Sequence, residues 1–189
     1  ANERGEIHSF SSENGGPIKH TGISTQWAIQ SLFWEAPDIL WLGPMEGGLW
    51  RGSLSSHELE DLSGEELPEK QVRVLFRDSR DCLWIGTSDG VFTRQSAGPI
   101  TAMDLGKVTY VNAILEDPQG WIWIATYGKG LVRIGPNGHH FFGEGQGIDP
   151  GIYGMARDRA GLLWLSSDSG LFRFDPMTQA VVQFTQKAG

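Results

Sequence analysis

The 189-residue chain has one cysteine, few basic residues and no long hydrophobic run. The single cysteine, Cys82, excludes an internal disulfide, and we expect it to be a small apolar residue in a strand. The longest apolar runs have about five residues, far fewer than the roughly 20 of a transmembrane helix, so no membrane insertion of this chain is expected. The net charge of −8 makes nucleic acid an unfavourable partner, because the acidic chain and the phosphate backbone would repel each other.

Helix-forming patterns are also missing, since no stretch repeats Ala, Leu, Glu and Lys at a 3.6-residue period. The chain is rich instead in glycine, with 26 residues, and in tryptophan, with eight. Many glycines together with many aromatic residues indicate short strands joined by tight turns. The sequence therefore predicts an all-β protein.

An internal repeat is the main feature of the sequence. Four segments align on one tryptophan each, and these tryptophans recur about every forty residues, a period typical of β-propeller blades. The segments are ILWLGPMEGGLWR, CLWIGTSDGVFTR, WIWIATYGKGLVRI and LLWLSSDSGLFRF, with Trp41, Trp84, Trp123 and Trp164 as their anchors. We expect these rings to pack between neighbouring sheets.

An aspartate begins the first turn of three repeats, as Asp78, Asp117 and Asp158, and Glu35 stands at this place in the first. Because an aspartate side chain can cap such a turn, we interpret the three as structural residues. Their recurrence once per repeat places them on separate blades, whereas the two carboxylates of a glycosidase must lie within about 10 Å of each other.

The repeats predict about four four-stranded antiparallel blades, at residues 27–70, 71–107, 108–149 and 150–189. Residues 1–26 are expected to hold the outer strand of a preceding blade, within residues 5–10, and a linker. An extra outer strand would be left unpaired in a closed four-bladed ring. We therefore expect a partial propeller, or one completed by association, for example as a homo-oligomer; a self-closed four-bladed monomer remains the alternative.

The repeat resembles that of the two-component regulator propeller family. Asp117 to Gly120, the strand Ile122 to Thr126 and the segment Gly130 to Arg133 follow the family pattern of Asp-x-x-Gly, apolar-Trp-apolar and Gly-Leu-x-Arg. The likeness extends over residues 27–187, with departures at Pro44 and at Thr93-Arg94. It implies a periplasmic sensor region of a bacterial histidine kinase or diguanylate cyclase.

Propellers bind ligands on the face formed by the loops into the innermost strands and by the turns between second and third strands. Aromatic rings beside hydrogen-bonding groups suit a small polar ligand, of which carbohydrate is one class. The alternative is that these are ordinary solvated loop residues. The candidates are Trp27, Gln30, Glu46, Arg73, Asp89, Tyr110, Asn112, Tyr127, Lys129, Tyr153 and Asp168.

No catalytic or metal-binding motif stands out. HExxH, CxxC and calcium-loop patterns are absent, and adjacent strand residues such as His139 and His140 point to opposite faces, so neither metal nor cofactor is expected. We predict a non-catalytic ligand-sensing segment that binds a small polar ligand or a protein partner. The alternatives are a protein-interaction scaffold without a small ligand and, third, a propeller enzyme such as a lyase or quinoprotein.

Overall fold

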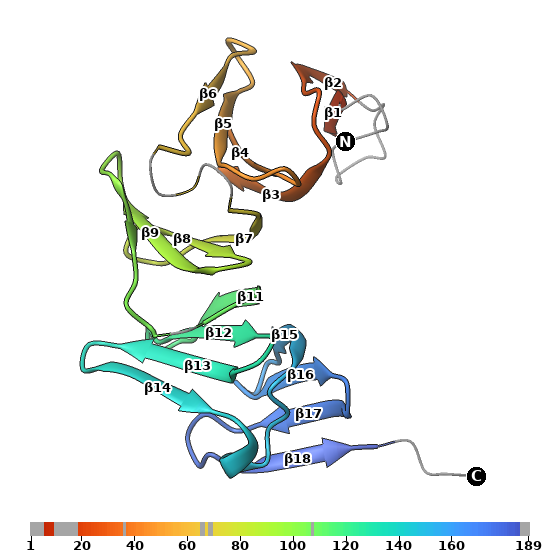
Figure 1. Ribbon diagram of the computed structural model, residues 1–189, viewed down its shortest axis with the longest axis vertical. Coiled ribbons are helices and arrows are strands. Elements are labelled where there is room, and N and C mark those ends of the chain that lie inside the picture. Colours follow the sequence, from red (N-terminus) through yellow and green to blue (C-terminus); the bar gives the residue numbers. More distant parts are fainter. Residues whose placement is uncertain are drawn as a thin grey trace. The chain divides into compact units, whose positions relative to one another are not determined.

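The computed structural model describes residues 6–9, 19–35, 37–64, 67, 70–106 and 108–185. The described part of the chain contains strands and one 3-10 turn, η1 (Glu144–Gln146), and no α-helix. Four of its sheets have four strands each, and every pairing within them runs antiparallel between consecutive strands (Figure 1). The predicted all-β fold of four-stranded β-propeller blades is confirmed.

The chain divides into two compact units, residues 1–75 and 76–189, which we describe separately. The first unit contains a two-stranded and a four-stranded sheet. The two-stranded sheet pairs β1 (Glu6–Ser9) with β2 (Lys19–Ser24). The four-stranded sheet has the order β3 (Ile29–Glu35), β4 (Ile39–Pro44), β5 (Trp50–Ser53) and β6 (Leu59–Asp61).

Strand β7 (Val72–Arg77) begins in the first unit and ends in the second. It is followed in its sheet by β8 (Cys82–Thr87), β9 (Gly90–Gln95) and β10 (Ile100–Ala102). The third sheet consists of β11 (Val111–Glu116), β12 (Ile122–Thr126), β13 (Gly130–Gly135) and β14 (Gly138–Phe142). The fourth consists of β15 (Ile152–Arg157), β16 (Leu163–Ser167), β17 (Gly170–Phe174) and β18 (Val181–Phe184).

Strand β2 lies where the sequence analysis expects a linker. Its Ile23 is buried against Leu40 and Leu42 of β4. A Cβ atom added to Gly52 would lie 3.0 Å from Cδ1 of Ile23, so the glycine permits this close approach. The N-terminal hairpin therefore covers part of one face of the first four-stranded sheet. The other residues assigned to this region, 1–5 and 10–18, lie outside the described residues.

The core of the second unit lies between the third and fourth sheets. All five residues of β12 are buried, because apolar side chains cover both faces of this strand. The ring of Trp123 lies 5.7 Å from that of Phe142 in its own sheet and 5.6 Å from that of Phe174 in the fourth sheet. Rings and branched aliphatic side chains of this kind therefore pack the two sheets against each other.

Candidate functional site

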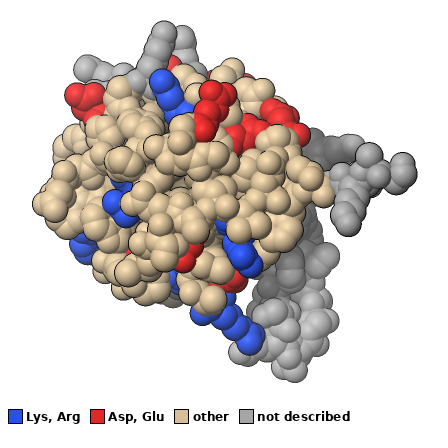
Figure 2. All heavy atoms as spheres, turned by 90° about the horizontal axis from the view of Figure 1, so that it is seen from below, with Lys and Arg blue, Asp and Glu red and all other residues tan. Residues whose placement is uncertain are grey.

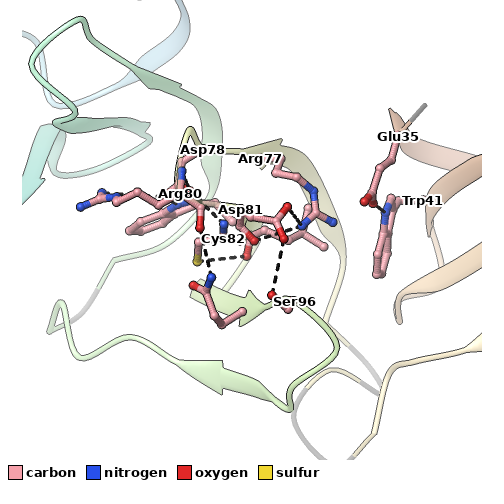
Figure 3. Close-up of polar contacts among 11 residues, drawn as sticks. Glu35, Trp41, Arg77, Asp78, Arg80, Asp81, Cys82 and Ser96 are labelled. Carbon is pink, nitrogen blue, oxygen red and sulfur yellow. Dashed lines mark hydrogen bonds and ion pairs between the residues drawn. The ribbon is translucent and has the colours of Figure 1, made fainter. Parts of the chain in front are cut away.

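Each anchor tryptophan donates a hydrogen bond to the carboxylate that stands six residues before it. The Nε1–Oδ2 distance is 2.9 Å from Trp84 to Asp78, 2.7 Å from Trp123 to Asp117 and 2.9 Å from Trp164 to Asp158. In the first blade Nε1 of Trp41 donates to Oε2 of Glu35 at 2.6 Å (Figure 3). The indole N–H therefore has a charged acceptor in all four blades, where the tryptophan is buried in the first three and half-buried in the fourth.

The second oxygen of each aspartate closes the turn that follows. Oδ1 of Asp117 accepts hydrogen bonds from the backbone N–H groups of Gln119 and Trp121, both at 3.0 Å. Asp78 makes the same pair of contacts in its own turn (Figure 3), and so does Asp158. The hydrogen bond from Trp164 lowers the pKa of Asp158, because it stabilises the charged form. Both oxygens of these carboxylates are thus committed to the blade itself.

A different group of side chains meets where the third and fourth blades adjoin. Tyr127, which follows β12, and Tyr153 of β15 have ring centroids 5.7 Å apart. The hydroxyl of Tyr153 donates a hydrogen bond of 2.7 Å to Oδ1 of Asp168, in the turn between β16 and β17. The two rings remain 44% and 51% exposed, so an aromatic surface beside a carboxylate faces solvent. We call Tyr127, Tyr153 and Asp168 the tyrosine face.

The hydrogen bond within the tyrosine face changes the titration of the phenol. It raises the pKa of Tyr153 to about 12, chiefly because the Asp168 carboxylate accepts a hydrogen bond from the neutral phenol, and also because the carboxylate charge opposes ionisation. Tyr153 is therefore a neutral hydroxyl at every physiological pH, and this hydroxyl donates its hydrogen bond to Asp168.

The loop before β15 supports this face and was not predicted to belong to it. Gly151 bridges to Tyr127, and a Cβ atom added to Gly151 would lie 3.1 Å from the Tyr127 ring and 3.2 Å from Oδ2 of Asp168. Asp149 accepts hydrogen bonds from the backbone N–H groups of Gly151 and Ser169 and from the Ser169 hydroxyl. A glycine and a capping aspartate therefore bring the two loops together.

Four other candidates of the second unit are placed differently. Tyr110 is half exposed and joins the edge of the face through its backbone, since its C=O accepts a hydrogen bond of 3.0 Å from the N–H of Tyr127. Tyr110 has a φ of 46°, a left-handed conformation that is strained for an aromatic residue. Nδ2 of Asn112 donates to the C=O of Ile152 at 2.7 Å, and so links β11 to β15. Lys129 and Asp89 are exposed in their turns.

The first unit carries the remaining candidates. The Trp27 ring lies 4.6 Å from that of Trp50, and the C=O of Trp27 accepts a hydrogen bond from the Thr25 hydroxyl. Gln30 and Glu46 are exposed, and Arg73 is half-buried in β7. Trp27 is thus packed within its own unit, unlike the solvent-facing tyrosines.

The described residues contain no group of three or more His, Cys, Asp or Glu side chains that could hold a metal ion. Within the same part of the chain, no helix has the length and apolar character needed to cross a membrane.

Comparison with known families gives a match over two segments of the chain. The model of the family described as two component regulator propeller matches residues 66–89 and 106–128. The first segment contains Asp78 and Trp84, and the second contains Asp117 and Trp123, so the matched segments hold two of the four tryptophan–carboxylate pairs. No curated protein sequence matches the chain.

Solved structures share the fold at low sequence identity. An extracellular domain assigned to a one component system of B. thetaiotaomicron has a TM-score of 0.70 at 23% identity, over 84% of this chain and 22% of that one. An extracellular domain assigned to a hybrid two component system of the same organism has a TM-score of 0.58 at 20% identity, over 90% of this chain and 30% of that one. This chain thus spans less than a third of either protein.

A third similar structure is a catalytically inactive virginiamycin B lyase from Staphylococcus aureus, with a TM-score of 0.74 at 14% identity, over 97% of this chain and 64% of that one. At these identities the likenesses concern the fold alone. The family match places two-component regulator propeller repeats at residues 66–89 and 106–128, two of the segments in which the sequence predicted them.

Proposed function

We propose that this chain is a non-catalytic, ligand-sensing propeller segment of a bacterial two-component or diguanylate cyclase receptor, placed outside the cytoplasm. The tyrosine face is the observation that carries the proposal. The family match and the extracellular domains of similar fold support the sensory role and the extracytoplasmic location.

The chemistry of the tyrosine face fits a small polar ligand with an apolar side, and carbohydrate is the class that fits best. Exposed rings such as those of Tyr127 and Tyr153 offer a surface on which the C–H groups of a sugar can stack. The Asp168 carboxylate and the Tyr153 hydroxyl supply hydrogen-bonding groups within reach of the same surface. Gly151 keeps the backbone beside these rings free of a side chain.

The position of the face suggests how binding could be sensed. Tyr127 belongs to the third blade, while Tyr153 and Asp168 belong to the fourth. A ligand that touches all three therefore favours the arrangement in which the blades hold these groups together. Because the ligand would bind this arrangement more tightly than one in which the groups are apart, it would bias a two-state receptor whose output lies elsewhere in the protein.

Calorimetric titration of the chain with a panel of neutral oligosaccharides tests the proposal. We expect at least one to bind, and we expect Tyr127→Ala and Tyr153→Ala each to weaken that binding by tenfold or more. Met177→Ala is the matched control, because Met177 is 79% exposed in the turn between β17 and β18, at the opposite end of the strands. Equal affinity in all four proteins would contradict the proposal.

A protein-interaction scaffold is the second candidate. The exposed apolar side chains of the fourth sheet, Leu171, Val182 and Phe184, favour it. Capture of one defined protein partner, unaffected by Tyr127→Ala and Tyr153→Ala and without oligosaccharide binding, would support this scaffold function over ligand sensing. The likeness to a lyase concerns the fold and gives no ground to propose catalysis here.

A further inference from the structure

Asp168 of the tyrosine face carries a charge that no basic side chain of the described residues neutralises. Its Oδ1 accepts the hydrogen bond from the Tyr153 hydroxyl, which is a neutral donor. Within the same part of the chain, no lysine or arginine forms an ion pair with Asp168, and no group donates a hydrogen bond to its Oδ2. Asp81, by contrast, lies 3.0 Å from Nη1 of Arg77. Asp168 therefore presents a ligand with one open oxygen and an uncompensated charge.

The segments that hold the tyrosine face are more acidic than basic. The loop before β15 and the two turns that carry Tyr127 and Asp168 also contain Glu144 and Asp149, against a single basic residue, Lys129. Lys129 is exposed, and among the described residues it forms no ion pair with any of these carboxylates. A cation that approaches the face therefore meets more negative than positive charge.

The open oxygen of Asp168 and the ring of Tyr127 border one small space. A Cβ atom added to Gly151 would lie 3.2 Å from Oδ2 of Asp168 and 3.1 Å from the Tyr127 ring, so any side chain at this position would fill the space between them. The Tyr153 ring lies 5.7 Å from that of Tyr127, centroid to centroid, and is tilted by 36° against it. Glycine at position 151 thus leaves the carboxylate and the ring accessible to the same group of a ligand.

Exposed aromatic rings beside an unpaired carboxylate favour a positively charged group over a neutral one. The face of a tyrosine ring attracts a cation that lies within about 6 Å of its centroid. A neutral ligand that covered Asp168 would remove water from the carboxylate without supplying an opposite charge, which costs free energy. An ammonium group offsets this cost, because it supplies both the positive charge and N–H donors.

We propose that the tyrosine face binds an amino sugar through its protonated amine. This inference rests on the proposed function, because the sugar ring would stack on Tyr127 and Tyr153. The ammonium group donates a hydrogen bond to Oδ2 of Asp168 and lies against the Tyr127 ring, beside the backbone that Gly151 leaves uncovered. The Tyr153 hydroxyl occupies Oδ1, so the carboxylate offers the ligand its other oxygen.

The attraction has to be separated from the general effect of an acidic chain. The net charge of −8 attracts any cation weakly and over a long range. Figure 2 views the end of the molecule that carries β18 in Figure 1, and charged side chains are few and scattered on it. No broad field of one sign covers that end, so selective binding of an ammonium group depends on direct contact with a single carboxylate.

Calorimetric titration of the full chain with two matched trisaccharides tests the proposal. One is a trisaccharide of glucosamine and the other is its neutral N-acetylated form, both at about pH 6, where a free amine of this kind is protonated. We expect the glucosamine trisaccharide to bind about tenfold more tightly. Asp168→Asn should reduce this preference to less than about threefold while the neutral form still binds, because the asparagine C=O can accept the Tyr153 hydroxyl.

Asp104→Asn is the matched control, because it removes the same charge at an exposed loop position and should leave the preference unchanged. Equal affinity for the two trisaccharides, binding of neither, or a preference that Asp168→Asn does not reduce would overturn the proposal. The ligand-sensing function would still stand if any neutral oligosaccharide of the panel binds and Tyr127→Ala weakens that binding, so the two failures are distinguishable.

Discussion

The pairing of Trp123 with Asp117 shows how one carboxylate serves two roles in a blade. Oδ2 of Asp117 accepts the indole N–H, and Oδ1 accepts two backbone N–H groups of the turn. The side chain is only 6% exposed, so water cannot readily replace these contacts. The same pair occurs in three blades, with Glu35 providing the carboxylate in the first.

Replacing Asp117 by alanine should therefore destabilise the chain. Asp117→Ala leaves a buried indole N–H and two turn donors without their acceptor, and we expect a loss of about 2 to 3 kcal/mol in the free energy of unfolding. Urea unfolding measures this loss. Asp104→Ala, at an exposed loop position, is the control and should change stability by less than about 0.5 kcal/mol. Equal losses in the two variants would contradict the structural role of Asp117.

Tyr153 should titrate apart from an ordinary tyrosine. Its pKa is raised to about 12 from 10.0 by the hydrogen bond to Asp168, so the folded state holds the proton more tightly than the unfolded state. The stabilisation is complete below pH 10 and is lost as the pH rises through about 12. Ultraviolet titration should show one of the three tyrosines ionising near pH 12.

Asp168→Asn removes the carboxylate charge and is the variant to compare in the same titration. We expect the late ionisation to move down towards pH 10, the ordinary value for a tyrosine. A late ionisation that persists unchanged in this variant would show that Asp168 is not its cause.

At the residue scale, the sequence predicted one of the two roles of these aspartates. Their position at the start of each turn predicted that they cap the turn, but the hydrogen bond from the tryptophan indole was not predicted. A signal was present, because each anchor tryptophan follows its carboxylate by six residues in all four repeats. Asp149 and Gly151 were missed for a different reason, since they lie in a connecting loop that the repeat does not specify.

At the scale of the sheet, the third and fourth blades offer a matched pair of positions. Phe142 ends β14 and is fully buried, whereas Phe184 ends β18 and is 43% exposed. We expect Phe142→Ala to lower the free energy of unfolding by about 3 to 5 kcal/mol, and Phe184→Ala by less than about 1 kcal/mol. Chemical denaturation of both variants checks this. A large loss at Phe184 would mean that its ring is covered in solution.

The strands of the four blades were predictable because each combines a turn residue with a short apolar run. The β1–β2 hairpin was not predicted to pair in this way, since KHTGIS in β2 has a single large apolar residue, Ile23, and no repeat to support it. Packing of Ile23 on Leu40 and Leu42 supplies the stabilisation that local sequence does not show. The blade boundaries assigned from sequence remain predictions.

At the scale of the whole molecule, a forty-residue period was sufficient to predict the fold, because every blade must repeat the same turns and the same packing. Binding residues lie in loops that differ from blade to blade, so the sequence could nominate eleven candidates without showing which of them meet. The structure brings Tyr127, Tyr153 and Asp168 together, while Asn112 links two strands and Trp27 packs on Trp50.

The most direct test of ligand sensing is a map of the backbone amide resonances of the isotope-labelled chain, recorded with and without each oligosaccharide of the panel. The account predicts saturable shifts for at least one sugar, clustered at Tyr127, Gly151, Tyr153 and Asp168, with β6 and the turn at Met177 unchanged. Shifts that centre elsewhere, or no shift with any member of the panel at millimolar concentration, would contradict it.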